Sequence, residues 1–327
     1  MSAAPRRPRP AAKKAAPPAT RAATPARQRR VLPRIAVPDL PDDPTAADAV
    51  RRAIAASVDR LVRHDPVVRR GVDPEGVHQA RVATRRLRSD LRTFSSLLDA
   101  QWTQRLRDEL SEFAALLGAV RDADVLLQRL RDAAATLPEA ERQGAEAVLA
   151  DLVATRTSDR ARLLAAMRDP RYDALLADLA AAAARPVVVE EAAEPAASVL
   201  PPLAARPWRR LNRAVRALGD EPPDAALHEV RILAKRARYA AEAVAPVVGQ
   251  QATDFARAVA KLQEVLGDHH DAVVAQGWLR EAAGRHPEAA FAAGTLAGLE
   301  QAEAARCRAG WRPAWDRASV KRLRSWM

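Results

Sequence analysis

The chain has 327 residues, of which 48% are hydrophobic and only 4% aromatic, and its formal net charge is +12. Because strand-favouring residues are scarce and Ala, Leu and Arg dominate, the composition predicts an all-α protein. The single cysteine, Cys307, excludes an internal disulfide. No stretch approaches the roughly 20 apolar residues that a membrane-spanning helix needs, so we expect a cytoplasmic protein without membrane contact.

Most of the positive charge lies at the N-terminus. Residues 1–40 contain ten Lys and Arg against one acidic residue, Asp39, which accounts for +9 of the +12. We predict residues 1–42 to be a disordered tail rich in Pro, Ala and Arg. Since the remaining chain is nearly neutral, a strong positive field there must come from local arrangement.

The first helix has clear start and stop signals. Thr45 and Asp48 form a capping-box pattern ahead of apolar residues at helical spacing, which predicts a helix over residues 46–64. Pro66 and Gly71 are expected to end it.

Three further helices complete a first half that we place at residues 43–184. Asp73 and Pro74 suit the N-cap and first position of a helix that carries residues 78–92. Apolar spacing then predicts helices over 103–132, from 138 to about 169, and over 171–184. Long helices joined by short connections favour a four-helix bundle.

The second half repeats this plan. Prolines interrupt residues 185–206, which are predicted to be a linker. Helices are then expected over 207–218, from 224 onward, and over 250–283 and 287–310, giving a second bundle over 207–310. Residues 311–327 are predicted to be a basic tail that contains tryptophans.

One helix of the first half carries a row of cations. At 100° per residue, His78, Arg81, Arg85, Arg88 and Arg92 fall within an arc of about 80°, and apolar residues occupy the opposite side. Like charges at helical spacing repel each other by a few tenths of a kcal/mol per pair, so the row indicates an absent anionic partner.

The row recurs in the second half. At an offset of 150, His228 matches His78, and the other matching residues are Arg231, Lys235, Arg236 and Arg238, opposite Arg81, Arg85, Arg86 and Arg88. Residues 118–124 match 265–271 less cleanly, at an offset of 147. We interpret this as an internal repeat that relates two four-helix bundles.

The residue types fit an extended anion. Arginine offers a flat fork of donors to phosphate, lysine a mobile point charge, and protonated histidine a donor. One row spans about 14 residues, or roughly 20 Å, which favours a linear polyanion over a small phosphate ester.

The repeated motif resembles the CHAD domain, the conserved histidine α-helical domain. The resemblance covers about residues 43–310 and rests on the two cation rows together with Arg121-Asp122-Ala123-Asp124 and Leu266-Gly267-Asp268-His269-His270-Asp271. It implies two pseudo-two-fold-related helical bundles and inorganic polyphosphate bound in a basic groove between them. The implied binding residues are His78, Arg81, Arg85, Arg88, Arg92, His228, Arg231, Lys235 and Arg238, with Arg86, Arg236 and Tyr239 ranked lower.

The resemblance also implies binding without catalysis, in the cytoplasm or at polyphosphate granules. Family members occur joined to a triphosphate-cleaving tunnel domain, for which this sequence has no strand pattern, so we expect no hydrolysis, cofactor or metal. One departure is that Arg92 is matched by Glu242, so the two ends of the groove need not be equivalent.

Acidic and histidine residues near the motifs allow another interpretation. Asp122, Asp124, Asp268 and Asp271 could hold a divalent ion, although we favour pairing with arginines of neighbouring helices. The sequence His269-His270-Asp271 is a poor zinc site, because adjacent helical residues point about 100° apart. We expect Cys307 to be an inert, partly buried thiol.

Two other functions compete with polyphosphate binding. Nucleic acid would also suit a basic tail and basic rows, and tryptophans in the C-terminal tail would supply stacking surfaces. Histidine phosphotransfer would use His78 or His228 on a helical bundle, although each histidine here heads a row of cations. We favour polyphosphate, with weak non-specific nucleic-acid binding by the tails and no evident protein partner.

Overall fold

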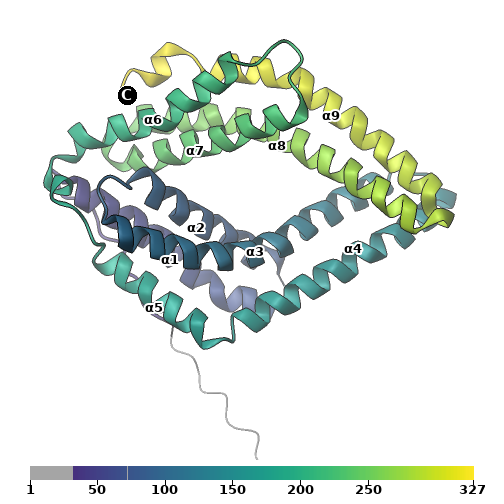
Figure 1. Cartoon of the computed structure of the whole chain (residues 1–327), viewed down its shortest axis with the longest axis horizontal. Helices are drawn as coiled ribbons and strands as arrows, with labels where there is room; N and C mark the ends of the chain where they lie inside the picture. The colour runs from purple at the N-terminus through teal and green to yellow at the C-terminus, as the bar shows by residue number, and fades with distance from the viewer. Residues whose placement is uncertain (1–31, 72) are drawn as a thin grey trace, which may run out of the picture. The chain divides into compact units, whose positions relative to one another are not determined.

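The computed structural model describes residues 32–71 and 73–327, and within them the chain is helical with no β-strand (Figure 1). The all-α prediction is confirmed. Most of the predicted N-terminal tail lies outside the described residues. The α-helices are α1 (Ala46–Arg70), α2 (Pro74–Thr93), α3 (Ala100–Ala134), α4 (Glu139–Ala166), α5 (Pro170–Ala184), α6 (Ala196–Arg216), α7 (Asp224–Val248), α8 (Gln250–Arg285) and α9 (Ala290–Ala318).

Two groups of helices pack along successive parts of residues 33–327. Helices α1, α2, α3 and α5 contact one another in the first group, and α6, α7, α8 and α9 do so in the second. Helices α2 and α7 are neighbours across the two groups. Away from α2 and α7, helices α3 and α4 pack against α8 and α9 (Figure 1). This contact is a separate apolar cluster that includes Leu127, Leu130, Val148, Leu279 and Leu296.

Local sequence explains why α2 begins where it does. The carboxylate of Asp73 accepts a hydrogen bond of 2.8 Å from the backbone N–H of Glu75, and Pro74 occupies the first helical turn. Ala83, Leu87 and Leu91 are fully buried, so α2 turns its apolar side into the core and leaves its cationic side free of it.

Helix α1 runs six residues past its predicted end. Pro66, which was expected to end the helix, lies inside it. One contact with α5 and one within α1 support the end of the helix. Asp65 accepts hydrogen bonds from Tyr172 Oη at 3.0 Å and from Arg69 Nε at 2.8 Å. Gly71 then caps the helix in the left-handed conformation, with φ of 74°.

The predicted linker over residues 185–206 is wrong from Ala196 onward, because α6 begins there and contains three prolines. Its apolar face buries Leu200, Leu203 and Trp208 in the second group, and this packing outweighs the prolines' weak helix propensity. The connection that remains, residues 185–195, bonds through its backbone to residues near 45 and 98.

The predicted basic tail over residues 311–327 is helical as far as Ala318, and this part contributes buried side chains to the core. Helix α9 continues to Ala318 with Pro313 inside it, and Trp311 and Trp315 are 2% and 8% exposed. The ring of Trp315 stacks on Trp208 of α6 with centroids 5.3 Å apart. Burial of large aromatic side chains explains why the helix persists beyond its predicted end.

Candidate functional site

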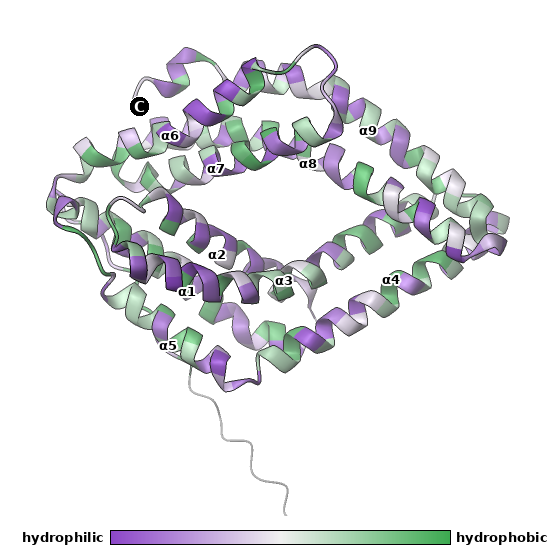
Figure 2. Cartoon of the chain, viewed as in Figure 1, coloured by the Kyte–Doolittle hydropathy of each residue, from purple (hydrophilic) through white to green (hydrophobic). Residues whose placement is uncertain are grey.

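Helices α2 and α7 direct cations from the two groups into one pocket. The central pocket has a volume of about 310 Å³ and is lined from α2, α3, α7 and α8. Figure 2 shows hydrophilic and hydrophobic residues alternating along these helices, as a helix that is buried on one side requires. The charged lining residues are Arg81, Arg85, Asp122, Arg129, Arg231, Lys235 and Asp271, with His270 beside them.

Two smaller pockets continue this surface. A bridging pocket of about 180 Å³ shares Arg85 and Lys235 with the central pocket and adds Arg88, Arg92, Arg236 and Tyr239. An arginine pocket, also of about 180 Å³, shares Arg92 and Arg236 with the bridging pocket and adds Arg206 and Arg210 of α6. The higher-ranked residues of the two predicted rows that line this continuous series of pockets are Arg81, Arg85, Arg88, Arg92, Arg231 and Lys235. His78, His228 and Arg238 line none of the three pockets.

The cations in the central and bridging pockets lie so close together that burial and mutual repulsion disfavour their protonated forms. Burial and the neighbouring Arg231, Arg85 and Arg81 lower the pKa of Lys235 to about 7. Burial also lowers the pKa of Arg85 and of Arg231. The Nε atoms of these two arginines are buried without a hydrogen-bond partner, so the site holds donors that an added anion could satisfy.

The first arginine after the histidine in each row has an acidic partner on the next helix. Arg81 pairs with Asp122 at 2.7 Å, and Arg231 pairs with Asp271 at 3.6 Å. These pairs orient the guanidinium groups and offset part of the positive charge in the central pocket.

A glycine of the neighbouring helix lies beside each of these arginines, at a distance where an added Cβ would make an ordinary van der Waals contact. A Cβ on Gly118 would lie 3.8 Å from Arg81 Nε, and one on Gly267 would lie 3.7 Å from Arg231 Nε. These contacts match Gly118 with Gly267, an offset of 149, whereas the predicted offset of 147 places Gly118 opposite Val265. The predicted pairing of residues 118–124 with 265–271 is therefore off by two residues.

The aspartates behave mainly as partners of arginine. Asp124 pairs with Arg156 of α4, in addition to the pairs of Asp122 and Asp271. Asp268 differs, because burial and the nearby Asp271 raise its pKa. Within the described ranges, no group of three or more His, Cys, Asp or Glu side chains is arranged to hold a metal ion.

The histidines lie at one end of the site. The ring of His228 packs on His270 with centroids 4.1 Å apart, and burial together with His228 lowers the pKa of His270 to about 4. Burial also lowers the pKa of His78 and of His228. His269 points elsewhere, to Asp224 at 3.2 Å, as expected for adjacent residues of a helix.

The lower-ranked residues separate into two kinds. Arg236 lines both the bridging and arginine pockets, and Tyr239 lines the bridging pocket. Arg86 instead pairs with Glu242, which also accepts a hydrogen bond of 2.7 Å from Arg238 Nε. Glu242, which matches Arg92 at the predicted offset of 150, therefore neutralises two cations.

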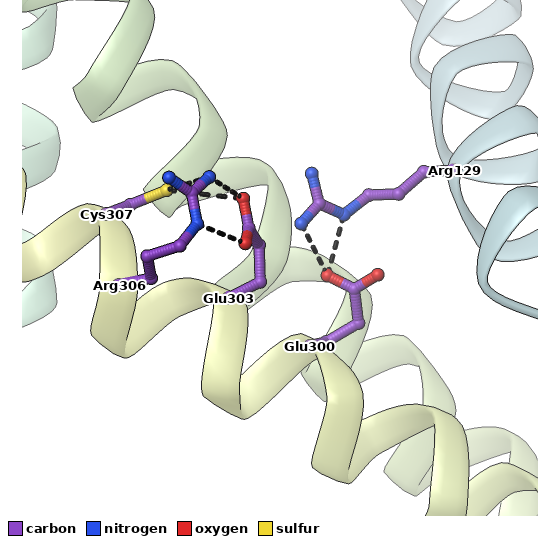
Figure 3. Close-up of polar contacts among 5 residues, drawn as sticks. All are labelled: Arg129, Glu300, Glu303, Arg306 and Cys307. Carbon is purple, nitrogen blue, oxygen red and sulfur yellow. Dashed lines mark hydrogen bonds and ion pairs between the residues drawn. The ribbon is translucent and has the colours of Figure 1, made fainter.

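The sequence interpretation assigns no binding role to Arg129, His270, Arg206 or Arg210. Arg129 of α3 is a central-pocket residue whose Nε donates a hydrogen bond of 2.7 Å to Glu300 of α9, and Figure 3 shows this contact beside the Glu303, Arg306 and Cys307 cluster. Glu300 is only 4% exposed. Arg206 and Arg210 are one helical turn apart, a signal that becomes visible only once α6 is known to be a helix.

Cys307 is buried, and its Sγ lies 3.5 Å from Glu303 Oε1 (Figure 3). Burial and Glu303 raise the pKa of this thiol to about 11, as an unreactive cysteine requires. None of the helices described here has an apolar run long enough to cross a bilayer.

Solved structures share this architecture. PptA from Streptomyces chartreusis is similar, with a TM-score of 0.71 and 28% identity over 84% of this chain and 99% of that one. The CHAD domain of the plant Ricinus communis has a TM-score of 0.70 and 29% identity over 89% of this chain and 98% of that one.

Sequence comparison agrees. Two uncharacterized proteins from two strains of Mycobacterium tuberculosis are 34% identical to this chain over 294 residues, which is 85% of this chain and 55% of theirs. The chain thus spans about half the length of these curated relatives. Residues 52–280 match the CHAD domain family, which includes both cation rows and the pockets between α2 and α7. The chain belongs to the CHAD domain family.

Proposed function

We propose that this protein binds inorganic polyphosphate, without catalysis, along the central and bridging pockets between α2 and α7. One observation carries the proposal. Arg81 and Arg85 from one helix meet Arg231 and Lys235 from another in a single pocket, although burial and mutual repulsion lower the pKa of Lys235 to about 7. An anion bound among these cations would stabilise their charged forms.

The form of the site favours a long anion over a compact one. Adjacent pockets share Arg85 and Lys235, so successive anionic groups of one chain would meet cations from both helices. The unpartnered Nε donors of Arg85 and Arg231 would each bind a phosphate oxygen. Membership of the CHAD family and the likeness to PptA support a polyphosphate-related function.

Binding alone is sufficient for the biological role that we infer. A protein that holds polyphosphate without cleaving it would localise to, or help to organise, polyphosphate granules in the cytoplasm. The acidic side chains at the site serve to position arginines, as the contacts Arg81–Asp122 and Arg231–Asp271 indicate.

Nucleic acid is the principal alternative, and one observation weakens it. The C-terminal tryptophans that would stack on bases are partly used by the core, since Trp315 stacks on Trp208 and Trp326 packs edge-on against Phe255. In the described part of the site, Tyr239 is the aromatic ring near the cations, and it is 6% exposed. Single-stranded nucleic acids generally need accessible rings.

Histidine phosphotransfer is a second alternative, and labelling decides it. The ring of His228 is packed against His270, and His78 has Arg121, Arg85 and Arg81 nearby. If radiolabel from a phosphorylated response regulator appeared on His78 or His228, phosphotransfer would replace binding as the function.

The test of polyphosphate binding compares polyanions at physiological salt. Long-chain polyphosphate, heparin and RNA are titrated against the full chain and against a chain that lacks residues 1–40, which separates the pockets from the basic N-terminus. We expect polyphosphate to bind most tightly, and to do so in both proteins. Equal or tighter RNA binding would contradict the proposal.

A further inference from the structure

The arginine pocket differs from the other two pockets in composition. Its four cations are Arg92 of α2, Arg236 of α7, and Arg206 and Arg210 of α6. The side chains of Ser89, Thr93 and Ser95 provide hydroxyl groups in the same lining. Arg92, Arg206 and Arg210 are exposed, so the pocket is open to a ligand, while the Nε of Arg236 is buried without a hydrogen-bond partner.

Charge compensation separates the arginine pocket from the central pocket. In the central pocket, Asp122 and Asp271 lie among the cations, and Arg129 is paired with Glu300. Among the residues that the structure describes, no carboxylate lines the arginine pocket, and none forms an ion pair with its four arginines. The arginine pocket therefore concentrates four uncompensated charges in about 180 Å³, against about 310 Å³ for the central pocket.

Neighbouring charge makes this concentration unfavourable in the free protein. Arg92 is exposed as a whole residue, but partial desolvation of its side chain and the nearby Arg236, Arg107 and Arg88 lower its pKa. Glu242, which occupies the place that corresponds to Arg92 in the second half, pairs with Arg86 and Arg238 instead. Arg92 therefore adds a cation to the arginine pocket, whereas Glu242 neutralises cations outside the three pockets.

We propose that the arginine pocket binds the terminal phosphate of a polyphosphate chain whose internal phosphates lie in the bridging and central pockets. This inference rests on the proposed function and adds that the protein recognises chain ends. An internal phosphate of the polymer carries one negative charge. A terminal phosphate resembles a phosphate monoester, which loses its second proton near pH 6 and then carries close to two charges. The end of the chain fits the pocket with the densest uncompensated positive charge.

The fit also has a geometric basis. The arginine pocket shares Arg92 and Arg236 with the bridging pocket, so a chain can run from one to the other without leaving the cations. Guanidinium groups bind two oxygens of one phosphate, and a terminal phosphate offers three that are not used in the polymer linkage. Hydroxyl groups of Ser89 and Thr93 can donate to the remaining oxygen.

The test compares polyphosphate of one defined length in two forms. In one form the ends are free, and in the other both terminal phosphates are capped as phosphoramidates with a neutral amine. Binding of each form is measured with the full chain, with the double variant Arg206→Gln and Arg210→Gln, and with the control double variant Arg209→Gln and Arg213→Gln. The control removes the same charge from exposed positions of α6 that line none of the three pockets.

We expect the unaltered protein to bind free-ended chains about tenfold more tightly than capped chains, the value of one or two charge-assisted hydrogen bonds. The variant Arg206→Gln and Arg210→Gln should lose this preference while binding capped chains as before, and the control should retain it. Equal binding of both forms by the unaltered protein would overturn chain-end recognition, as would an equal loss for both forms in the pocket variant. If neither form binds, the proposed function itself fails, and that result is distinct from either of these.

Discussion

The guanidinium carbon of Arg85 lies 5.4 Å from the ring centroid of Tyr239, which joins a cation of α2 to an aromatic side chain of α7. Arg238 lies 5.5 Å from the same centroid. Tyr239 is buried, so its ring forms a fixed surface against which both arginines are oriented. The relationship couples the two groups of helices at the boundary between the central and bridging pockets.

Replacing Tyr239 with leucine should weaken polyphosphate binding about three- to tenfold, because Arg85 loses an interaction of about 1 kcal/mol that fixes its direction. The variant Tyr239→Phe keeps the ring and should retain affinity. Isothermal titration measures both, with circular dichroism to check helicity. If Tyr239→Leu and Tyr239→Phe bind equally well, the ring does not position Arg85.

Binding should depend on pH through Lys235. Burial and the neighbouring arginines lower its pKa to about 7 in the free protein, so the amine is charged below that pH and neutral above it. Bound polyphosphate favours the charged form and raises this pKa, so binding takes up a proton at about pH 8, and the affinity contributed by Lys235 falls as pH rises from about 6 to about 8.

The variant Lys235→Arg provides the matched control, because arginine stays charged over this range. Its affinity should change less with pH than that of the unaltered protein, and titrations in buffers of different ionisation enthalpy should show less proton uptake. An identical pH profile in the two proteins would remove Lys235 from the site.

Glu300 should restrain the affinity of the central pocket. It pairs with Arg129, whose side chain reaches from α3 to α9 (Figure 3). Glu300→Gln should lower the free energy of unfolding by about 1–3 kcal/mol, because Arg129 is partly buried and loses its charged partner. Polyphosphate affinity should rise, because Arg129 becomes an uncompensated cation of the pocket.

The matched control is Glu139→Gln, which removes an equal charge from an exposed pair with Arg142. It should change neither property by much. Urea unfolding and titration are measured on the same preparations. Loss of stability in Glu300→Gln without a gain in affinity would show that Arg129 takes no part in binding.

Some features of this fold follow from local sequence and others depend on packing. The capping box of Thr45 and Asp48 and the Asp73–Pro74 start signal both form as predicted, because their contacts lie within one helical turn. Pro66 and the prolines of α6 gave the wrong helix ends, because buried residues such as Leu203 hold those helices through distant contacts. Tertiary packing of this kind leaves no local signal.

The site divides in the same way. Helical periodicity predicts that Arg81, Arg85 and Arg231 lie on cationic helix faces, and the structure places them in one pocket with Lys235. Arg129 could not be found by periodicity, because its role depends on which part of α3 faces α7 and α8. The sequence predicts Arg92 as the end of a row. Its pocket neighbours Arg206 and Arg210 belong to α6, whose first part is predicted as linker, so the sequence does not connect them with Arg92.

A buried carboxylic acid lies beside the site, on the side of α2 that faces α1. Asp90 is 2% exposed and accepts a hydrogen bond of 3.1 Å from Ser57 Oγ, while its Oδ1 has no partner. Burial raises its pKa from 3.8 to about 7. Since the folded state then binds the proton more tightly than the unfolded state, the contribution of Asp90 to stability is greatest below about pH 4 and falls by at most about 4 kcal/mol as pH rises to about 7.

Asp90→Asn should remove this dependence, because the amide carries no charge at either pH. The variant should gain stability relative to the unaltered protein between about pH 5 and about pH 8, measured by urea unfolding. A stability difference that is the same at both values would mean that Asp90 ionises normally in the folded protein.

The central claim is that cations from α2 and α7 bind one polyanion together, and the salt dependence of polyphosphate affinity tests it most directly. The double variant Arg85→Gln and Lys235→Gln is compared with Arg105→Gln and Arg317→Gln, which remove two exposed charges away from the pockets. We predict that the first variant binds at least tenfold more weakly. The magnitude of its slope of log affinity against log salt should fall by about one to two, whereas the control keeps the affinity and the slope of the unaltered protein. An unchanged affinity and slope in a fully helical Arg85→Gln and Lys235→Gln protein would contradict the account.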